Sequence, residues 1–250
     1  MFSFKGRTAL ITGAATGIGQ TIAIKFAEAG CNVIVTDKPD ISLEETVNFC
    51  EPFGSAIIAE AMDIRDLDQI KSVIQKIEKA GCKIDILVNN AGINKPLQAD
   101  RVDIDNWDDH FNTNVRGGFF CSQAVAKNMI KNKFGRIIFI SSQSGLIGIP
   151  GQAVYCATKG AIINLVRTLG VEWAKHNITV NSVAPTFVET NLTRERLKNP
   201  DFKKFVLGKI PSGKLALTED VAHAVLYLAS DYAGMVNAFT LAVDGGWTAW

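Results

Sequence analysis

Short apolar runs alternate with longer amphipathic segments along almost all of the 250 residues, and this alternation restricts the fold more than any other feature. In residues 66–80, for example, Ile70, Val73, Ile74 and Ile77 recur at helical spacing. Strands that alternate with helices form βαβ units, in which the strands lie parallel in one sheet. The apolar runs lie at Thr8–Thr12, Asn32–Thr36, Ala56–Met62, Ile84–Val88, Arg136–Ile140, Thr179–Val183 and Phe239–Val243.

The predicted strands are nearly continuous in apolar residues, which is typical of a sheet covered on both faces. We therefore predict an α/β protein with a doubly wound, mostly parallel seven-stranded sheet and helices on both faces, the Rossmann fold. No linker or change of composition divides residues 1–250, so we predict a single domain. The predicted helices cover Ile18–Ala29, Ser42–Phe53, Asp66–Ala80, Asn106–Lys131, Ala153–Lys175 and Thr218–Ser230, with Ser42 and Thr218 as N-caps.

One polar segment, at about residues 186–213, is too long for an ordinary loop. It begins directly after Pro185, at the end of the sixth predicted strand. We predict an insertion that covers the substrate and contains some helix of its own.

The composition of the chain argues against several classes of partner. Lys and Arg number 26 and Asp and Glu 25, a net charge of +1, whereas nucleic-acid-binding proteins usually have a basic excess. No apolar run has the length of a membrane span, and the first residues lack the pattern of a signal peptide. The five Cys show no metal-binding spacing and the three His form no cluster, so we predict reduced thiols, no metal site and a cytoplasmic protein.

A glycine-rich turn, Thr12–Gly19, lies between the first predicted strand and the first helix. Such a turn lets main-chain N–H groups approach a pyrophosphate, which then sits on the N-terminus of the helix. Glycines also occur in turns that bind nothing, but the strand–turn–helix context favours nucleotide binding. The residues expected to contact the nucleotide are Gly13, Thr16, Gly17, Ile18 and Gly19.

Asp37 closes the second strand, 18 residues beyond Gly19. A carboxylate at this point accepts hydrogen bonds from the hydroxyls of the adenosine ribose and repels a ribose phosphate. Lys38 lies next to it and weakens that repulsion. We predict NAD rather than NADP as cofactor; the alternative is that Asp37 is a solvated turn residue.

Further along the chain, several short motifs occur in a fixed order. After Thr12–Gly19 come Asn89-Asn90-Ala91-Gly92, Asn114, Ser142, Tyr155-Cys156-Ala157-Thr158-Lys159, Pro185 and Asp244-Gly245-Gly246. Each motif alone is weak evidence. The full set, in this order over nearly the whole chain, resembles the short-chain dehydrogenase/reductase family.

This resemblance implies catalysis by Asn114, Ser142, Tyr155 and Lys159. Tyr155 and Lys159 are four residues apart, so both lie on one face of a helix. The pKa of a free tyrosine is about 10, and we expect a nearby ammonium to lower it, so that Tyr155 acts as base. Lys159 is expected to bind the nicotinamide ribose, Ser142 to hold the substrate oxygen, and Asn114 to hold a water of a proton relay.

For the serine, Ser141 is an alternative; Ser142 is preferred because it lies 13 residues before Tyr155, the usual separation in the family.

The resemblance also implies the remaining contacts of the cofactor and the substrate. Where many family members have Gly after the proline, this chain has Thr186, which puts the path of the main chain there in question. Lys95 and Arg194 are candidates to pair with a substrate carboxylate. Further cofactor contacts are expected from Asp63, Ile64, Asn90, Ala91, Gly92, Tyr155, Lys159, Pro185, Val188 and Thr190. Substrate contacts are expected from Ser142, Gln143, Asn94, Gln152 and Tyr155.

The segments Glu172–Ile178 and Val243–Trp247 look like those of the sugar-acid branch of the family, such as gluconate 5-dehydrogenases and 2-dehydro-3-deoxy-gluconate dehydrogenases. We therefore predict hydride transfer between NAD and a secondary alcohol or ketone of a sugar, sugar acid or polyol. The alternatives are an NADPH-dependent 3-oxoacyl-thioester reductase and a non-catalytic nucleotide sensor. The resemblance further implies a homotetramer, in which Trp247 and Trp250 contact another subunit or pack on their own.

Overall fold

The computed structural model describes residues 2–191 and 193–249. In this part of the chain, seven strands form one sheet with the order β3-β2-β1-β4-β5-β6-β7, and every neighbouring pair is parallel. Each strand overlaps the apolar run predicted for it, so the predicted sheet is confirmed. The strands are β1 (Thr8–Thr12), β2 (Asn32–Asp37), β3 (Ile57–Ala61), β4 (Ile86–Asn89), β5 (Gly135–Ile140), β6 (Ile178–Pro185) and β7 (Thr240–Val243).

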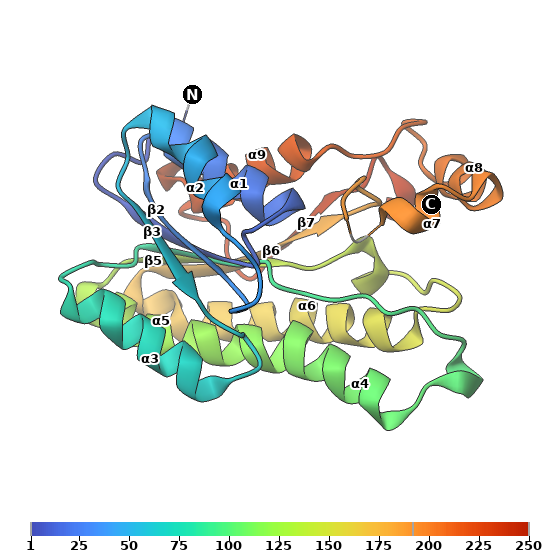
Figure 1. Ribbon diagram of the computed structural model, residues 1–250, viewed down its shortest axis with the longest axis horizontal. Helices are drawn as coiled ribbons and strands as arrows, with labels where there is room; N and C mark the ends of the chain where they lie inside the picture. Colours follow the sequence, from blue (N-terminus) through green and yellow to red (C-terminus); the bar gives the residue numbers. More distant parts are fainter. Residues whose placement is uncertain (1, 192, 250) are drawn as a thin grey trace.

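Helices cover both faces of this sheet (Figure 1). On one face lie α1 (Gly17–Glu28), α2 (Glu44–Cys50) and α9 (Thr218–Ala229). On the other lie α3 (Leu67–Lys79), α4 (Ile104–Phe111), α5 (Gly118–Asn132) and α6 (Ala153–Trp173). The chain therefore forms the predicted doubly wound Rossmann fold.

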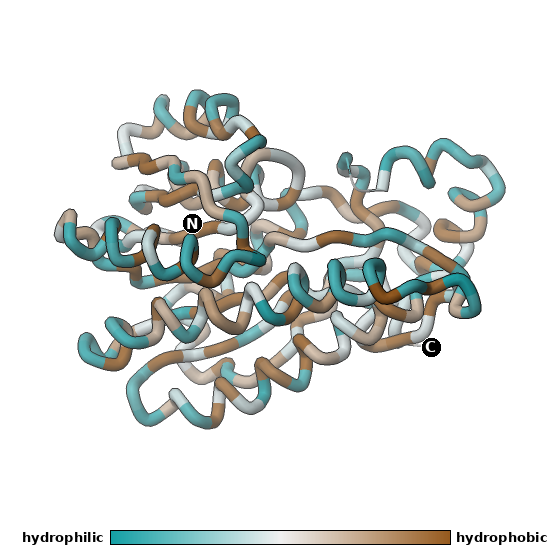
Figure 2. Tube along the Cα trace, turned by 60° about the horizontal axis from the view of Figure 1, so that its bottom comes forward, coloured by the Kyte–Doolittle hydropathy of each residue, from teal (hydrophilic) through white to brown (hydrophobic). Residues whose placement is uncertain are grey.

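The core consists of two apolar layers because successive residues of a strand point to opposite faces. In β1, Leu10 packs into the layer under α3, α5 and α6, whereas Ile11 packs into the layer under α1 and α9. The covering helices are amphipathic, and hydrophobic and hydrophilic residues alternate along them in Figure 2. Burial of both faces explains why the strands lack polar alternation.

The strand order reverses between β1 and β4, and this reversal creates the site. The chain leaves β1 toward α1 on one face and leaves β4 toward α4 on the other. The carboxyl ends of these strands therefore border a crevice, where open α/β sheets bind their ligands.

The region predicted as one helix, Asn106–Lys131, consists of three pieces. Helix α4 ends at Phe111, a π-helical turn covers Asn112–Gly117, and α5 follows. Periodicity does not reveal such a turn, because one extra residue per turn changes the spacing only locally. The turn contains Asn114.

Two predicted N-caps are wrong by one residue. Helix α2 begins at Glu44 with Leu43 as N-cap, although Ser42 Oγ accepts a hydrogen bond from the Glu44 N–H at 3.3 Å. Helix α9 begins at Thr218 itself, and Asp220 Oδ2 accepts from the Leu217 N–H at 2.9 Å. The polar segment 186–213 contains two helices, α7 (Arg194–Leu197) and α8 (Pro200–Lys209).

The five cysteines are free thiols, and burial raises the pKa of Cys31 and Cys121 to about 12. None of the helices formed by the described residues has the length and apolar character that crossing a bilayer requires.

Candidate active site

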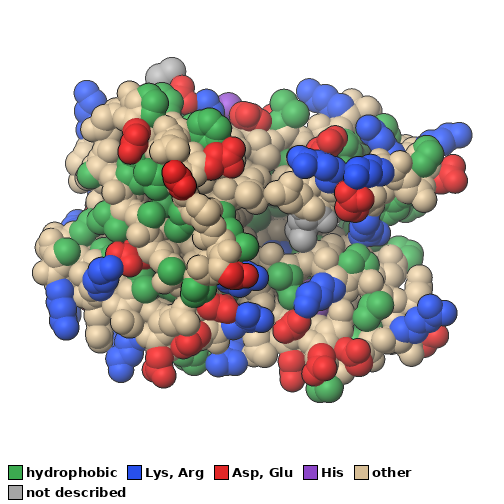
Figure 3. Space-filling view, in the orientation of Figure 1, with side chains coloured by type: hydrophobic (Ala, Val, Ile, Leu, Met, Phe, Trp, Pro, Cys, Tyr) green, Lys and Arg blue, Asp and Glu red, His purple; other side chains and the backbone are tan. Residues whose placement is uncertain are grey.

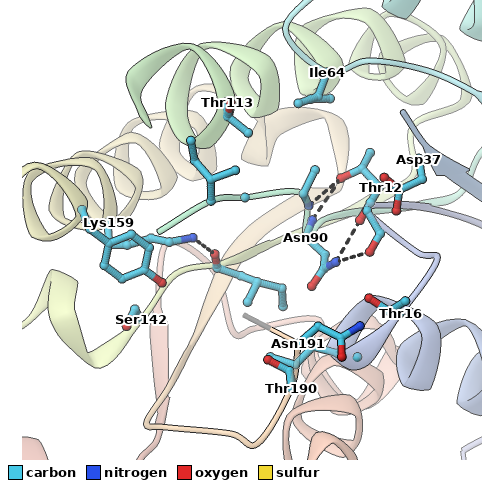
Figure 4. Close-up of a pocket in the computed structure, with 18 of the residues that line it drawn as sticks. Thr12, Thr16, Asp37, Ile64, Asn90, Thr113, Ser142, Lys159, Thr190 and Asn191 are labelled. Carbon is cyan, nitrogen blue, oxygen red and sulfur yellow. Dashed lines mark hydrogen bonds between the residues drawn. The ribbon is translucent and has the colours of Figure 1, made fainter. Parts of the chain in front are cut away.

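A cleft of about 570 Å³ opens at the carboxyl ends of the strands, on the crevice between β1 and β4. Figure 3 shows it as a hollow across the middle of one face, and Figure 4 shows the side chains inside it. The structure brings most of the predicted site residues together here. These are Gly13, Thr16, Gly17, Ile18, Asp37, Asp63, Ile64, Asn90, Ala91, Gly92, Ser142, Tyr155, Lys159, Pro185, Val188 and Thr190.

The other predicted site residues flank the cleft without lining it. Gly19 faces the Gly13 carbonyl beneath the glycine loop. The remaining four are polar side chains in segments next to lining residues. They are Asn114, Asn94, Gln143 and Gln152.

The glycine loop leaves room for a phosphate because side chains are excluded from it. Gly13 (φ +63°) and Gly17 (φ +61°) adopt the left-handed conformation that favours glycine. A Cβ on Gly13 would lie 2.8 Å from Ala91 Cα, and one on Gly19 would collide with the Gly13 carbonyl oxygen. Thr16 is the N-cap of α1, yet its side chain makes no capping hydrogen bond, which leaves the first N–H groups of the helix for an anion.

Thr12 and Asn90 connect the glycine loop to the end of β4. Thr12 Oγ1 accepts hydrogen bonds from the N–H groups of Asn90 and Ala91, both at 3.1 Å. Asn90 Nδ2 donates to the carbonyl oxygens of Thr12 and Gly13 at 3.0 and 2.8 Å. The two walls of the cleft are therefore fixed to each other (Figure 4).

Asp37, at the end of β2, points back to the glycine loop. Its Oδ2 accepts a hydrogen bond from the Ala15 N–H at 3.1 Å, and its Oδ1 accepts from the Lys38 N–H at 2.9 Å. These contacts orient the carboxylate beside the loop, while each oxygen retains a lone pair for a ribose hydroxyl. The position fits the predicted contact.

A charged pair at the same end of the cleft was not predicted. The Arg65 guanidinium donates to both carboxylate oxygens of Asp63, at 2.7 to 3.2 Å, and holds the pKa of Asp63 below its usual range. Arg65 Nη1 also lies 3.9 Å from Oδ1 of Asp109, a residue of α4. Its charge is therefore largely balanced by carboxylates of the protein itself.

Tyr155 and Lys159 lie one turn apart on α6, as their spacing predicts. Lys159 Nζ is 5.5 Å from the centre of the Tyr155 ring and donates a hydrogen bond of 2.8 Å to the carbonyl oxygen of Ile140, at the end of β5. Lys159 is buried at the cleft (Figure 4), and Tyr155 also lines the cleft. A phenol and an ammonium thus share one water-poor pocket.

Burial changes the acidity of both groups. It raises the pKa of Tyr155 from 10.0 to about 12, against the opposing effect of a hydrogen bond with Ser142. Burial lowers the pKa of Lys159 from 10.5 to about 8. The expected lowering of the Tyr155 pKa is not found in this structure, because the loss of hydration outweighs the hydrogen bond with Ser142.

The two neighbouring serines have different hydrogen bonds. Ser141 Oγ donates to the Lys159 carbonyl oxygen at 3.2 Å, which ties it to the main chain of α6. Ser142 Oγ accepts from the Ser144 N–H at 3.1 Å, and its hydroxyl also interacts with Tyr155, which opposes the rise in the pKa of that phenol. The contact with Tyr155 favours Ser142 over Ser141.

Asn114 holds the segment that follows β4. Its Oδ1 accepts from the Ile93 N–H at 2.8 Å, and its Nδ2 donates to the Ile93 carbonyl at 3.0 Å and to Thr158 Oγ1 at 3.1 Å. Both amide hydrogens are thus used within the protein. The predicted relay through Asn114 stays a prediction.

Three buried or half-buried amides next to Tyr155 and Ser142 carry atoms without hydrogen-bond partners. Asn94 Nδ2 donates to Gln152 Oε1 at 3.1 Å, but Asn94 Oδ1 and Gln152 Nε2 are unpartnered. Gln143 is 1% exposed, and neither end of its amide is partnered. Buried polar atoms are rarely left this way, so these amides are candidates for hydrogen bonds to a bound molecule.

The segment after β6 forms the opposite wall. Pro185 ends β6, and the Thr186 N–H donates to the Val243 carbonyl at 3.0 Å, so the main chain stays bonded to β7 at the position that is often Gly in the family. Thr186 Oγ1 lines the cleft and is a further unpartnered buried atom. Glycine is therefore not required here.

Several lining residues were missed by the sequence analysis, notably Lys38, Met62, Arg65, Thr113, Thr186, Asn191 and Thr193. They lie next to predicted residues, so their position after a strand was the available signal. Of the two residues expected to pair with a substrate carboxylate, Lys95 lines the cleft, but its Nζ already lies 2.6 Å from Asp109 Oδ2. The other, Arg194, does not line the cleft. Trp247 stacks on Phe187 of its own chain, whereas Trp250 lies outside the described residues.

Among the described residues, no three His, Cys, Asp or Glu side chains are grouped so that they could hold a metal ion. His110, predicted to lie at the surface or to have a packing role, is buried beside Tyr155 with a ring distance of 6.5 Å.

The chain resembles known proteins over its whole length. The sequence model described as enoyl-(acyl carrier protein) reductase matches residues 13–248. The 2-dehydro-3-deoxy-D-gluconate 5-dehydrogenase of Dickeya dadantii is 38% identical over 249 residues, which is 99% of this chain and 98% of that protein. The 3-oxoacyl-acyl-carrier-protein reductase of Thermotoga maritima is also 38% identical, over 97% of this chain and 98% of that protein.

A solved structure extends the likeness to three dimensions. The gluconate 5-dehydrogenase of Burkholderia cenocepacia, in complex with NADP and tartrate, superposes with a TM-score of 0.94 at 35% identity, covering 100% of this chain and 98% of that chain. The predicted family is confirmed by these full-length matches. The chain belongs to the short-chain dehydrogenase/reductase family and is a nicotinamide-dependent oxidoreductase.

Proposed function

We propose that this enzyme oxidises a secondary alcohol of a sugar acid, or reduces the corresponding ketone, with NAD(H). The observation that carries the proposal is the group of unpartnered amides on Asn94, Gln143 and Gln152, next to Tyr155 and Ser142. A chain of hydroxyl groups supplies both donors and acceptors for such atoms, whereas an alkyl chain would leave them unsatisfied.

The residues of the cleft have distinct proposed roles. Tyr155 takes the hydroxyl proton in the oxidation and returns it in the reduction. Ser142 donates a hydrogen bond to the substrate oxygen, and the Lys159 ammonium stabilises the phenolate that forms on Tyr155. The nicotinamide accepts or supplies the hydride when it is bound.

The structure has room for the dinucleotide along the glycine loop. The phosphates fit against Gly13–Gly19, the adenosine ribose against Asp37, and the adenine between Asp63 and Ile64. We propose NAD rather than NADP, because Asp37 occupies the place of a ribose phosphate and Arg65 is already paired with Asp63. NADP is present in related structures, including the Burkholderia cenocepacia enzyme.

A second substrate class has its own support. A pocket beside α8 is lined by Ile147, Ile149, Pro150, Phe205 and Trp247, with Lys209 at its edge. Such an apolar surface suits an alkyl chain, and the Thermotoga maritima relative is a 3-oxoacyl-thioester reductase by name. The second candidate is therefore reduction of a 3-oxoacyl thioester.

Initial rates on a substrate panel separate the two candidates. The panel contains gluconate, related sugar acids, polyols and keto sugar acids with NAD(H), and an acetoacetyl thioester with NADPH. We expect kcat/KM for a sugar acid to exceed that for the thioester by at least about a hundredfold, because an unmatched buried polar group costs about 1–3 kcal/mol each. Faster turnover of the thioester would overturn the proposed substrate class.

Tyr155→Phe tests the assignment of the base. It keeps the ring and removes the hydroxyl, so we expect kcat to fall by about 10² to 10⁴ while the Kd of NAD changes little. Wild-type enzyme that binds NAD and turns over no member of the panel would instead indicate a nucleotide sensor.

We further propose a cytoplasmic homotetramer. Large apolar side chains are exposed on α4 (Ile104, Trp107), on α6 (Val171) and beside β7 (Met235, Phe239). Exposed apolar patches of this kind often mark subunit contacts. Light scattering on the purified chain tests the tetramer, with a monomer as the opposing result.

A further inference from the structure

The peptide of Lys95, in the segment that follows β4, is held from both sides by side chains of α4. The Lys95 N–H donates to His110 Nε2 at 3.0 Å, and Asn106 Nδ2 donates to the Lys95 carbonyl oxygen at 3.1 Å. His110 is 1% exposed and Asn106 is 9% exposed. These contacts form a clamp between two buried side chains and the main chain of the exposed residue Lys95.

The clamp requires one form of the imidazole. His110 Nδ1 lies 2.7 Å from the Asn106 carbonyl oxygen, which accepts hydrogen bonds, so Nδ1 carries the proton. Nε2 faces an N–H group and must therefore be the unprotonated acceptor. The neutral tautomer with hydrogen on Nδ1 satisfies both contacts.

The clamped segment bears on the active site. One residue before Lys95, Asn94 hydrogen-bonds Gln152 and presents one of the unpartnered amide oxygens; one residue earlier, Ile93 is fixed by Asn114. The His110 ring also lies edge-on to the Tyr155 ring: the ring centres are 6.5 Å apart, and the ring planes make an angle of 69°. Movement of the Lys95 peptide would therefore displace Asn94 relative to the catalytic residues.

We propose that His110 is a positioning residue: as a neutral imidazole it fixes the Lys95 peptide and thereby sets the position of Asn94 for the substrate. The effect on substrate rests on the proposed function, whereas the clamp itself does not. The glycine loop lies between β1 and α1, and the cofactor-facing residues Asn90 and Ala91 are held by Thr12 rather than by His110, so the affinity for NAD should depend little on His110.

Two amide substitutions separate the acceptor from general packing. His110→Gln places an oxygen near the position of Nε2, and His110→Asn is a shorter amide that does not reach it. We expect hydrogen exchange of the Lys95 amide to be at least about tenfold faster in His110→Asn than in wild type, and close to wild type in His110→Gln. Equal exchange in the Asn variant and wild type, or equally fast exchange in both variants, would overturn the clamp.

Kinetics then test the role in substrate binding. We expect His110→Asn to raise KM for the preferred substrate about tenfold, with kcat and the Kd of NAD within about threefold of wild type, and His110→Gln to restore KM. A loss of NAD affinity that parallels the change in KM would overturn positioning in favour of a general structural role. His223→Asn, at an exposed histidine of α9, is the matched control.

The wild-type enzyme provides a test that needs no variant. Nitrogen-15 NMR distinguishes the two neutral tautomers of histidine, and we expect His110 to show the proton on Nδ1. A proton on Nε2 would overturn the proposal. If no substrate of the panel is turned over, the proposed function fails, while the tautomer and the amide exchange still decide the clamp.

Discussion

Lys159 Nζ lies 5.5 Å from the centre of the Tyr155 ring, and burial moves the pKa values of the two side chains apart, raising that of Tyr155 and lowering that of Lys159. Tyr155 holds its proton more firmly than a free tyrosine, and Lys159 loses its proton more readily than a free lysine. The site is therefore prepared for proton donation to a ketone at neutral pH, and proton removal from an alcohol requires additional positive charge beside Tyr155. An oxidised nicotinamide held by the cleft would supply such a charge.

The first prediction concerns the pH dependence of the reaction. Because burial raises the pKa of Tyr155 to about 12, the basic form is scarce at neutral pH, and kcat/KM for alcohol oxidation should rise with pH, by up to about tenfold per unit between about pH 6 and 8. Ketone reduction uses the protonated form and should stay nearly constant over that range. Steady-state rates in both directions provide the test, and an oxidation rate independent of pH would contradict it.

The second prediction concerns stability and Lys159. Its pKa is about 8 in the folded chain and about 10.5 when unfolded, so the folded state is penalised below about pH 8, and the penalty disappears as pH rises toward 10.5. The shift corresponds to a destabilisation of the folded state by about 3 kcal/mol. Replacing Lys159 removes this penalty but also removes the hydrogen bond to the Ile140 carbonyl, which costs about 1 kcal/mol. Lys159→Met should therefore stabilise the chain by about 2 kcal/mol at pH 7 while abolishing activity.

Urea unfolding without cofactor at pH 7 and at about pH 10 measures this difference. Lys71→Met, at an exposed residue of α3, is the control and should change little at either pH. A Lys159→Met variant that is less stable than wild type at pH 7 would show that the ammonium is not penalised there.

The third prediction concerns the choice of cofactor. Asp37→Asn removes the charge at the end of β2 and keeps an oxygen for the Ala15 N–H. A like-charge contact with a ribose phosphate costs at least about 1.4 kcal/mol, so the ratio of kcat/KM for NADP to that for NAD should rise about tenfold or more. Lys38→Ala should lower the same ratio. An unchanged ratio in Asp37→Asn would mean that the carboxylate does not face the ribose.

The parts of this site that are local in sequence could be predicted from sequence. Tyr155 and Lys159 lie on one helix, and the glycine loop lies within one strand–turn–helix unit, so spacing predicted how these residues are placed, whereas the proposed roles of Tyr155 and Lys159 came from the family resemblance. Asp37 and Ser142 follow the ends of strands, and parallel strands bring these ends to one edge of the sheet.

The features that depend on tertiary packing could not be predicted in this way. His110 was expected at the surface or in a packing role. The residues next to it in the sequence give no sign that it accepts a hydrogen bond from the Lys95 N–H. The raised pKa of Tyr155 follows from its loss of hydration in the folded chain, which periodicity does not measure. The π-helical turn around Asn114 replaces an expected continuous helix, since a single extra residue leaves the apolar pattern intact.

The last prediction compares two helical glycines that differ only in the space around them. Alanine is normally the better helix former by about 0.5–1 kcal/mol. Within α8, a Cβ on Gly208 would meet nothing within 4 Å, so Gly208→Ala should raise the free energy of unfolding by up to about 1 kcal/mol. Within α1, a Cβ on Gly19 would collide with the Gly13 carbonyl oxygen and lie 2.5 Å from Asn90 Nδ2.

Gly19→Ala should therefore lower the free energy of unfolding by about 1–3 kcal/mol, because the clash forces the glycine loop away from β4. The same displacement should weaken NAD binding, since the loop and the Asn90 segment border the phosphate site together. Urea unfolding and NAD titration of both variants test these expectations. Equal stability of the two alanine variants would show that the loop yields without cost and that the close approach at Gly19 is not needed to shape the site.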